Sequence, residues 1–161
     1  MALRNVTLMA MLAGLALSAC GHDQERAALN SGMGLYYNDQ GSVAALAYGA
    51  ANSDDVGLML QCVKGSGRVE VSDVARQAPA PRLILTSAGR STELPVALQS
   101  GMSDGPPILT ADTSSKSDAL AAFRKSGRIN VTYGKIRYGL RATSDEKRGV
   151  EEFFTACEGA A

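Results

Sequence analysis

Residues 128–142 read RINVTYGKIRYGLRA, and this stretch predicts a β-hairpin. Gly134 and Lys135 suit a two-residue turn of type II′, which takes glycine at its first central position, so that Tyr133 pairs with Ile136. In that register all the apolar residues face one way: Ile129, Val131, Tyr133, Ile136, Tyr138 and Leu140. The opposite face collects Arg128, Asn130, Thr132, Arg137, Gly139 and Arg141. The hairpin therefore predicts one buried side and one polar, basic side.

A short helix is predicted before the hairpin. Ser115 or Ser117 can cap its start, because a serine hydroxyl accepts hydrogen bonds from the first free amides of a helix. Leu120 and Phe123 lie on one face of this helix, and Gly127 is placed to end it.

A second helix is predicted after the hairpin, at the C-terminal end of the sequence. Thr143 and Glu146 have the spacing of a capping box, in which each side chain bonds the other residue's backbone amide. Gly159 is placed to end the helix. The apolar positions between them repeat at helical spacing and are Val150, Phe153, Phe154 and Cys157. This stripe predicts one buried helix face that carries a cysteine.

The chain before these helices alternates short apolar runs with turn residues, a pattern typical of antiparallel β-structure. The runs predict strands at 43–48, 56–63, 68–71, 82–86, 93–98 and 108–111. Pro95 cannot donate a hydrogen bond to a neighbouring strand, so its strand is expected at a sheet edge. We therefore predict an α+β fold: a mostly antiparallel sheet, arranged as a sandwich or partial barrel, with two short helices.

The composition of the 161 residues excludes several classes of protein. Lysine plus arginine equals aspartate plus glutamate, at 16 each, which argues against a nucleic-acid binder. The only histidine is His22, so a serine–histidine triad cannot be assembled from the body of the chain. No nucleotide-binding glycine motif or metal-ligand spacing is present, and we expect no cofactor, no metal site and no catalytic residue.

The first residues have the layout of an export signal. Arg4 precedes an apolar run that is shorter than the roughly 20 residues of a membrane-spanning helix. Leu17, Ser18, Ala19 and Cys20 follow, and this sequence resembles the lipobox of bacterial lipoproteins.

The lipoprotein resemblance implies a lipid anchor at Cys20. In that family the cysteine receives a diacylglycerol, the peptide is cut before it, and the new amino terminus is acylated; several acyl chains together hold a protein stably on a membrane. Gly21 follows where an aspartate would signal retention in the inner membrane, so the resemblance implies the outer membrane, facing the periplasm. We therefore expect a signal peptide at 1–19, a tether at 20–41 and one globular domain at 42–161. Within the tether, residues 35–37 can also dock on the domain as a short first strand.

The lipid anchor also accounts for the odd number of cysteines. With Cys20 acylated, Cys62 and Cys157 remain as an even pair in a chain sent to an oxidising compartment, and a disulfide between them is the simplest assignment. The alternatives are two free thiols or a pair of zinc ligands. A zinc site is disfavoured because neither cysteine has further metal ligands nearby in the sequence.

A run of basic residues around the hairpin is the leading candidate for a binding surface. Six cations fall within 18 residues that contain no acid: Arg124, Lys125, Arg128, Lys135, Arg137 and Arg141. The strongest candidates for contacting a partner are Arg128, Lys135, Arg137 and Arg141. The other interpretation is a solvated strand face whose charge is neutralised by the acidic stretch 145–152. We expect a lipid-anchored envelope protein that binds an anionic polymer, a membrane surface or an envelope protein without catalysis.

A second hypothesis is an aspartic-type peptidase or a hydrolase inhibitor in the periplasm. Asp112, Thr113 and Ser114 resemble the Asp-Thr-Ser or Asp-Thr-Gly loop of aspartic peptidases. A single domain would have to dimerise to supply the second carboxylate of that active site. The same residues can instead cap the helix that follows, and an inhibitor would need an exposed loop such as 100–107.

Overall fold

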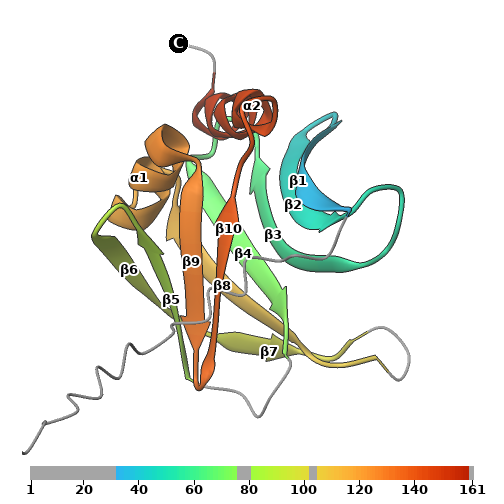
Figure 1. The fold of residues 1–161 in the computed structure, drawn as a ribbon, viewed down its shortest axis with the longest axis vertical. Helices are drawn as coiled ribbons and strands as arrows, with labels where there is room; N and C mark the ends of the chain where they lie inside the picture. Colours follow the sequence, from blue (N-terminus) through green and yellow to red (C-terminus); the bar gives the residue numbers. More distant parts are fainter. Residues whose placement is uncertain (1–31, 76–80, 102–104, 160–161) are drawn as a thin grey trace, which may run out of the picture.

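The computed structural model describes residues 32–75, 81–101 and 105–159, which form two β-sheets and two helices (Figure 1). In chain order the elements are β1 (Met33–Gln40), β2 (Val43–Ala50), β3 (Val56–Val63), β4 (Arg68–Val74), β5 (Arg82–Ser87), β6 (Arg90–Pro95), β7 (Ala97–Gln99), β8 (Ile108–Ser114), α1 (Asp118–Ser126), β9 (Arg128–Tyr133), β10 (Ile136–Arg141) and α2 (Glu146–Glu158).

The strands form a larger sheet in the order β1-β2-β3-β4-β8-β7 and a smaller sheet in the order β10-β9-β5-β6. All paired strands are antiparallel. In Figure 1 both helices lie at one end of the sheets, at the top of the view, and β7 lies toward the other end. The predicted α+β class and mostly antiparallel sheets are confirmed, and the sheets do not close into a barrel.

The core lies between the two sheets and under the helices. Val71 of the larger sheet and Leu85 and Val131 of the smaller sheet have no solvent exposure and belong to one apolar cluster. At one end of the core the Tyr133 hydroxyl donates a hydrogen bond to the Val74 carbonyl, at 3.1 Å. This bond links the two sheets directly.

The predicted hairpin is confirmed residue by residue. β9 and β10 pair with Tyr133 opposite Ile136 and Arg128 opposite Arg141. Gly134 has a φ of 55°, as the first central position of a type II′ turn requires, and Lys135 does not have a positive φ. The hairpin therefore presents its apolar face to the core and its basic face outward.

The expected boundary between tether and domain is wrong. Residues 33–40 form β1, which pairs along its whole length with β2, from Met33 opposite Ala50 to Gln40 opposite Val43. Residues 35–37 do join the sheet, but within a strand of 8 residues rather than as a short docked segment. Residues 38–40 at the end of this edge strand are all exposed and polar, so the segment resembles a linker in sequence.

The predicted strand 93–98 is in fact two strands in different sheets. β6 ends at Pro95 and lies at the edge of the smaller sheet, as the proline predicts, whereas β7 begins at Ala97 and pairs with β8 of the larger sheet. Between them the Val96 amide donates a hydrogen bond to the Pro81 carbonyl, at 3.1 Å. One apolar run therefore crosses from one sheet to the other at a single residue.

The serine caps predicted for α1 are wrong. Ser117 occupies the capping position, but its hydroxyl makes no hydrogen bond to the helix start. Instead the Ala119 amide donates to the Thr92 hydroxyl of β6, at 3.0 Å, and the Ser115 hydroxyl donates to Glu158 of α2, at 3.2 Å. Gly127 does end the helix, with a φ of 68°.

The capping box predicted for α2 is confirmed. The Thr143 amide donates to a Glu146 carboxylate oxygen at 2.7 Å, and the Glu146 amide donates to the Thr143 hydroxyl at 3.3 Å. The four residues of the apolar stripe are completely buried: Val150, Phe153, Phe154 and Cys157. Burying a phenylalanine side chain stabilises a fold by about 1.5–3 kcal/mol, so this stripe is a main anchor of the helix.

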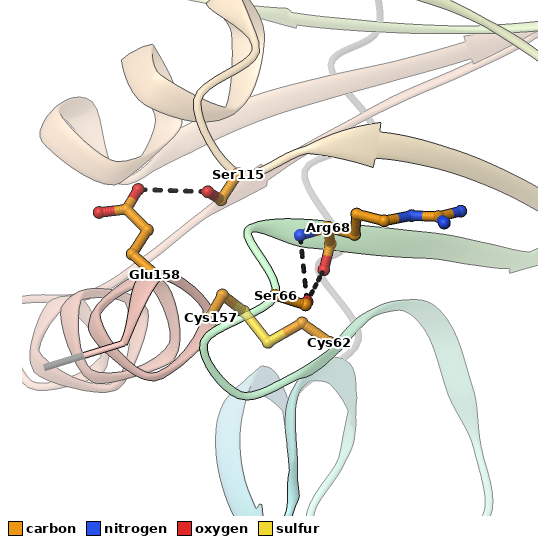
Figure 2. The surroundings of a disulfide bond; sticks show 6 residues. All are labelled: Cys62, Ser66, Arg68, Ser115, Cys157 and Glu158. Carbon is orange, nitrogen blue, oxygen red and sulfur yellow. Dashed lines mark hydrogen bonds between the residues drawn. A yellow bond between two sulfur atoms is a disulfide. The ribbon is translucent and has the colours of Figure 1, made fainter.

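The predicted disulfide joins the end of α2 to β3 (Figure 2). Cys62 and Cys157 have their Cα atoms 5.7 Å apart and are both buried. The β3–β4 turn adds two backbone bonds at the same place. The Gly65 amide donates to the Ala156 carbonyl at 2.9 Å, and the Gly67 amide donates to the Cys157 carbonyl at 2.8 Å. The turn therefore satisfies carbonyls that the end of a helix leaves without partners.

Candidate functional site

The outward face of the hairpin carries the four residues predicted to contact a partner. We define the basic face as Arg128, Asn130 and Thr132 of β9 with Arg137, Gly139 and Arg141 of β10, and Lys135 in the turn. Arg128, Lys135, Arg137 and Arg141 are all exposed. They are brought to one surface because alternate residues of a strand point the same way.

Two arginines of the basic face stand directly opposite each other. Arg128 and Arg141 are cross-strand partners at the open end of the hairpin. Like charges in directly opposed positions destabilise a strand pair. Within the described ranges neither guanidinium has a carboxylate within salt-bridge distance. The fold therefore places two cations side by side without neutralising them.

Arg128 and Arg141 both line a cavity of about 460 Å³, which we call the β10 cavity. Asn130 and Gly139 belong to the same wall. The remaining walls come from the β5–β6 turn, from the start of β1 and its neighbour β2, and from the start of α2; they include Ser87, Ala88, Met33, Gly34, Tyr48, Thr143 and Glu146. The cavity therefore lies beside the free edge of β10, where both sheets and α2 meet.

The Glu146 carboxylate in this cavity is held by backbone amides. One oxygen accepts the Thr143 amide of the capping box, and the other accepts the Leu35 amide of β1, at 2.9 Å. Burial, together with the negative charge of Glu146, raises the pKa of Tyr48. Tyr48 is therefore a neutral phenol at physiological pH, and Glu146 has a structural role in holding β1 to α2.

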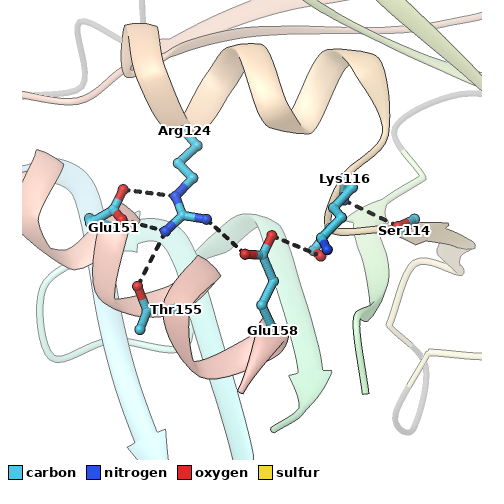
Figure 3. A network of polar contacts seen from close by, with 7 residues as sticks. Ser114, Lys116, Arg124, Glu151, Thr155 and Glu158 are labelled. Carbon is cyan, nitrogen blue, oxygen red and sulfur yellow. Dashed lines mark hydrogen bonds and ion pairs between the residues drawn. The ribbon is translucent and has the colours of Figure 1, made fainter. Parts of the chain in front are cut away.

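Arg124 does not belong to the basic face, contrary to its place in the predicted basic run. Its guanidinium points from α1 to α2 and pairs with Glu151 and with Glu158, the latter at 3.0 Å (Figure 3). It also donates to the Thr155 hydroxyl at 3.3 Å. The hydrogen bonds to Glu151, followed by the one to Glu158, raise the pKa of Arg124. The hydrogen bonds from Arg124 in turn lower the pKa of Glu151. Arg124 joins the two helices.

The acidic stretch 145–152 forms no ion pair with the hairpin residues within the described part of the chain. Glu151 pairs with Arg124, and Glu152 lies 3.8 Å from Arg148 of the same helix. Glu146 lines the β10 cavity together with hairpin residues, but its oxygens accept hydrogen bonds from backbone amides. These contacts therefore do not include the predicted neutralisation of the hairpin cations by the acidic stretch.

The Asp-Thr-Ser tripeptide forms the end of β8 rather than a catalytic loop or a helix cap. The exposed Asp112 carboxylate lies 3.5 Å from the Arg68 guanidinium, and Glu70 of β4 is its cross-strand partner. An exposed, ion-paired carboxylate within a regular strand does not reproduce the geometry of the loop that it resembles in sequence.

The lipobox, Cys20 and His22 lie outside the described residues. Neither of the two helices in the described ranges has the length and apolarity that crossing a bilayer requires. No three histidine, cysteine, aspartate or glutamate side chains gather there as a metal ion would need.

Comparisons with known proteins give no relative for this chain. No family model matches it, no curated protein matches it, and no solved structure matches it. The functional conclusion therefore depends on the residues and their geometry alone.

The β10 cavity was not predicted from the sequence, although both of its basic residues, Arg128 and Arg141, were candidates for contacting a partner. The hairpin register already placed Arg128 opposite Arg141, and that opposed pair was the available signal. Apart from Thr143 and Glu146, the other walls come from elements more than 30 residues away along the chain, and no local pattern places Met33 or Tyr48 beside β10.

Proposed function

We propose that this protein is a lipid-anchored component of the bacterial envelope that binds an anionic partner, without catalysis, through its basic face. Acylation at Cys20 attaches it to the outer membrane on the periplasmic side, and the domain from Met33 onward contacts an anionic envelope polymer. The buried Cys62–Cys157 disulfide supports export, because structural disulfides persist in oxidising compartments.

The opposed pair Arg128 and Arg141 is the observation that carries the proposal. Surface charges whose only role is solubility need not be placed directly across from a like charge, where they reduce stability. Arg124, from the same basic run, shows that the chain can pair an arginine with two carboxylates. Two arginines without carboxylate partners on one exposed face are suited to an anion supplied from outside.

The anchor is tested by intact mass spectrometry of the protein extracted from membranes. We expect a chain that starts at Cys20 and carries added acyl mass, and a mature chain that starts at another residue would contradict the anchor.

Binding is tested with the detergent-solubilised protein in two arms: cosedimentation with peptidoglycan sacculi, whose anions include carboxylates, and retention on immobilised lipopolysaccharide, whose anions include phosphates.

The decisive variant is Arg128→Glu with Arg141→Glu. We expect it to lose recovery in whichever arm the wild type binds. Lys116→Glu with Lys125→Glu is the matched control, because it makes the same change in net charge at exposed residues outside the basic face. Equal losses in the two variants, or no binding of the wild type in either arm, would overturn the proposal.

A further inference from the structure

We infer that the β10 cavity is a discrete binding site for a singly charged oxyanion, a carboxylate or a phosphodiester, carried on an apolar stem. This inference rests on the proposed function and assigns it a place and a ligand class. Arg128 and Arg141 line the cavity and stand opposite each other on neighbouring strands, so one anion bound between them can contact both guanidinium groups. Charge-assisted hydrogen bonds of this kind are about twice as strong as neutral ones.

The charges that line the cavity favour a monoanion. Arg128 and Arg141 contribute two positive charges, and Glu146 contributes one negative charge whose two oxygens already accept backbone amides. The lining therefore carries a net charge of one positive unit. A carboxylate or a phosphodiester balances this charge, whereas a phosphate monoester brings a second negative charge close to Glu146.

The free edge of β10 adds a backbone donor to the arginines. In a two-residue hairpin the pairs that exchange hydrogen bonds start at Tyr133 with Ile136 and continue at every second residue. Gly139 lies between these pairs, so its amide points away from β9, and β10 has no other neighbour in its sheet. Gly139 lines the cavity opposite Asn130 on β9 and two residues before Arg141 on β10. A strand edge flanked by cations is a suitable place for an anion.

The apolar part of the cavity lining is the reason for proposing an apolar stem on the ligand. Met33, which is half-buried, and the buried Leu140 and Tyr48 line the cavity together with the backbone of Gly34. These residues are the apolar part of the cavity lining. A small free anion would leave this wall in contact with water, whereas an anion attached to an acyl or aromatic group would cover it.

The experiment measures binding of three probes that share a phenyl group to the full chain by ¹⁵N NMR. The probes are benzoate, methyl phenyl phosphate and the neutral benzamide. We expect at least one of the two anions to bind in a saturable way and to shift the Gly139 and Asn130 amide signals, and we expect benzamide to leave them in place. Binding of the carboxylate alone or of the phosphodiester alone identifies the preferred anion and supports the site.

Two variants locate the binding. Arg141→Gln is expected to weaken the affinity for the bound anion about tenfold or more, because it removes one charge-assisted contact. Arg82→Gln is the matched control, because Arg82 is exposed on the outward side of the same sheet and pairs with Glu93. Equal weakening in both variants, equal binding of benzamide, or no binding of either anion would overturn the inference.

These results separate the inference from the proposed function. If sacculi or lipopolysaccharide require Arg128 and Arg141 but no small anion binds, the basic face contacts a polymer without a discrete site, and the inference alone fails. If a small anion binds and neither envelope polymer does, the cavity site stands and the proposed function fails.

Discussion

Two regions of this molecule use arginine in opposite ways. Where α1 meets α2, Arg124 is less than one-third exposed and is bonded to Glu151, Glu158 and Thr155. On the basic face, Arg128 and Arg141 are exposed, stand opposite each other and have no ion-pair partner among the described residues. These three arginines lie within 18 positions of each other in the sequence. Their roles are therefore determined by what the fold places beside them.

The helix region is also held by contacts that the hairpin region lacks. α2 is fixed at its start by the capping box and by the Glu146 bond to Leu35 of β1, and at its end by the disulfide. The basic face lies on two strands, one of which is a sheet edge. We therefore expect substitutions near α2 to change stability and substitutions on the basic face to change binding.

The largest effect is expected from the disulfide. Replacing Cys62 and Cys157 together by alanine removes a cross-link between residues 95 positions apart. In the chain-entropy account this lowers the free energy of unfolding by about 4–5 kcal/mol. Urea unfolding of the variant and of the wild type, with and without a reducing agent, measures the difference.

The reducing agent supplies the control for this prediction. It should lower the stability of the wild type toward that of the double variant and leave the variant unchanged. A wild type with the same unfolding midpoint in both conditions would show that the cross-link does not hold α2 to β3.

Substitution of one glycine in each region compares how rigid the two regions are, because an added Cβ would meet a neighbouring side chain at the same distance in both. A Cβ at Gly34 would lie 2.6 Å from an oxygen of Glu146, and a Cβ at Gly139 would lie 2.6 Å from the Asn130 side-chain oxygen. Glu146 is fixed by two backbone amides, whereas Asn130 is exposed and can turn away. Gly34→Ala should cost about 2 kcal/mol, because the Leu35 amide loses its partner.

Gly139→Ala should stay within about 0.5 kcal/mol of the wild type, as surface substitutions usually do. Thermal or urea unfolding of both variants tests the pair. Equal costs at the two glycines would mean that the contacts of Glu146 and Asn130 are equally rigid, and the contrast between the regions would fail.

Local sequence patterns predicted a large part of this fold. The hairpin register followed from apolar alternation around Gly134, and the capping box of α2 followed from Thr143 and Glu146. Each of these features depends on residues that are close together in the chain. The Cys62–Cys157 pair is distant, but it could be assigned because the expected acylation of Cys20 left two cysteines.

Other features that depend on distant partners could not be predicted. The cap of α1 comes from Thr92, on a strand that no helix pattern points to. β1 looked like a linker because its pairing with β2 and its contact with Glu146 are invisible in its own composition. The β10 cavity has the same origin, because its two arginines follow from the hairpin register while its apolar wall comes from β1 and β2.

A smaller effect is expected from Arg124→Gln. Losing the contacts with Glu151 and Glu158 should lower the free energy of unfolding by about 1 kcal/mol at pH 7, because the pair is partly exposed and screened by solvent. Arg124 lowers the pKa of Glu151 from its ordinary value of 4.5. The stabilisation that this shift provides is therefore present above pH 4.5 and is lost as the pH falls through the lowered pKa.

The pH dependence distinguishes an ionic contact from simple packing. The gap in stability between the wild type and Arg124→Gln should narrow between pH 7 and pH 3. A gap that keeps its size at pH 3 would mean that Arg124 stabilises the helices by packing, for example on the Phe154 ring 5.8 Å from its guanidinium carbon.

The smallest expected change in stability, that of Arg141→Gln, tests the central claim most directly. The claim is that the fold pairs Arg124 with carboxylates of α2 and leaves Arg141 available to an external anion. Urea unfolding of Arg141→Gln and Arg124→Gln in the same buffer at pH 7 and low salt compares the two arginines. Arg141→Gln should stabilise the free protein by about 0.5 kcal/mol, because it removes a like-charge contact with Arg128. Arg124→Gln should destabilise it. Opposite signs are the predicted result, and destabilisation by both substitutions would contradict the account.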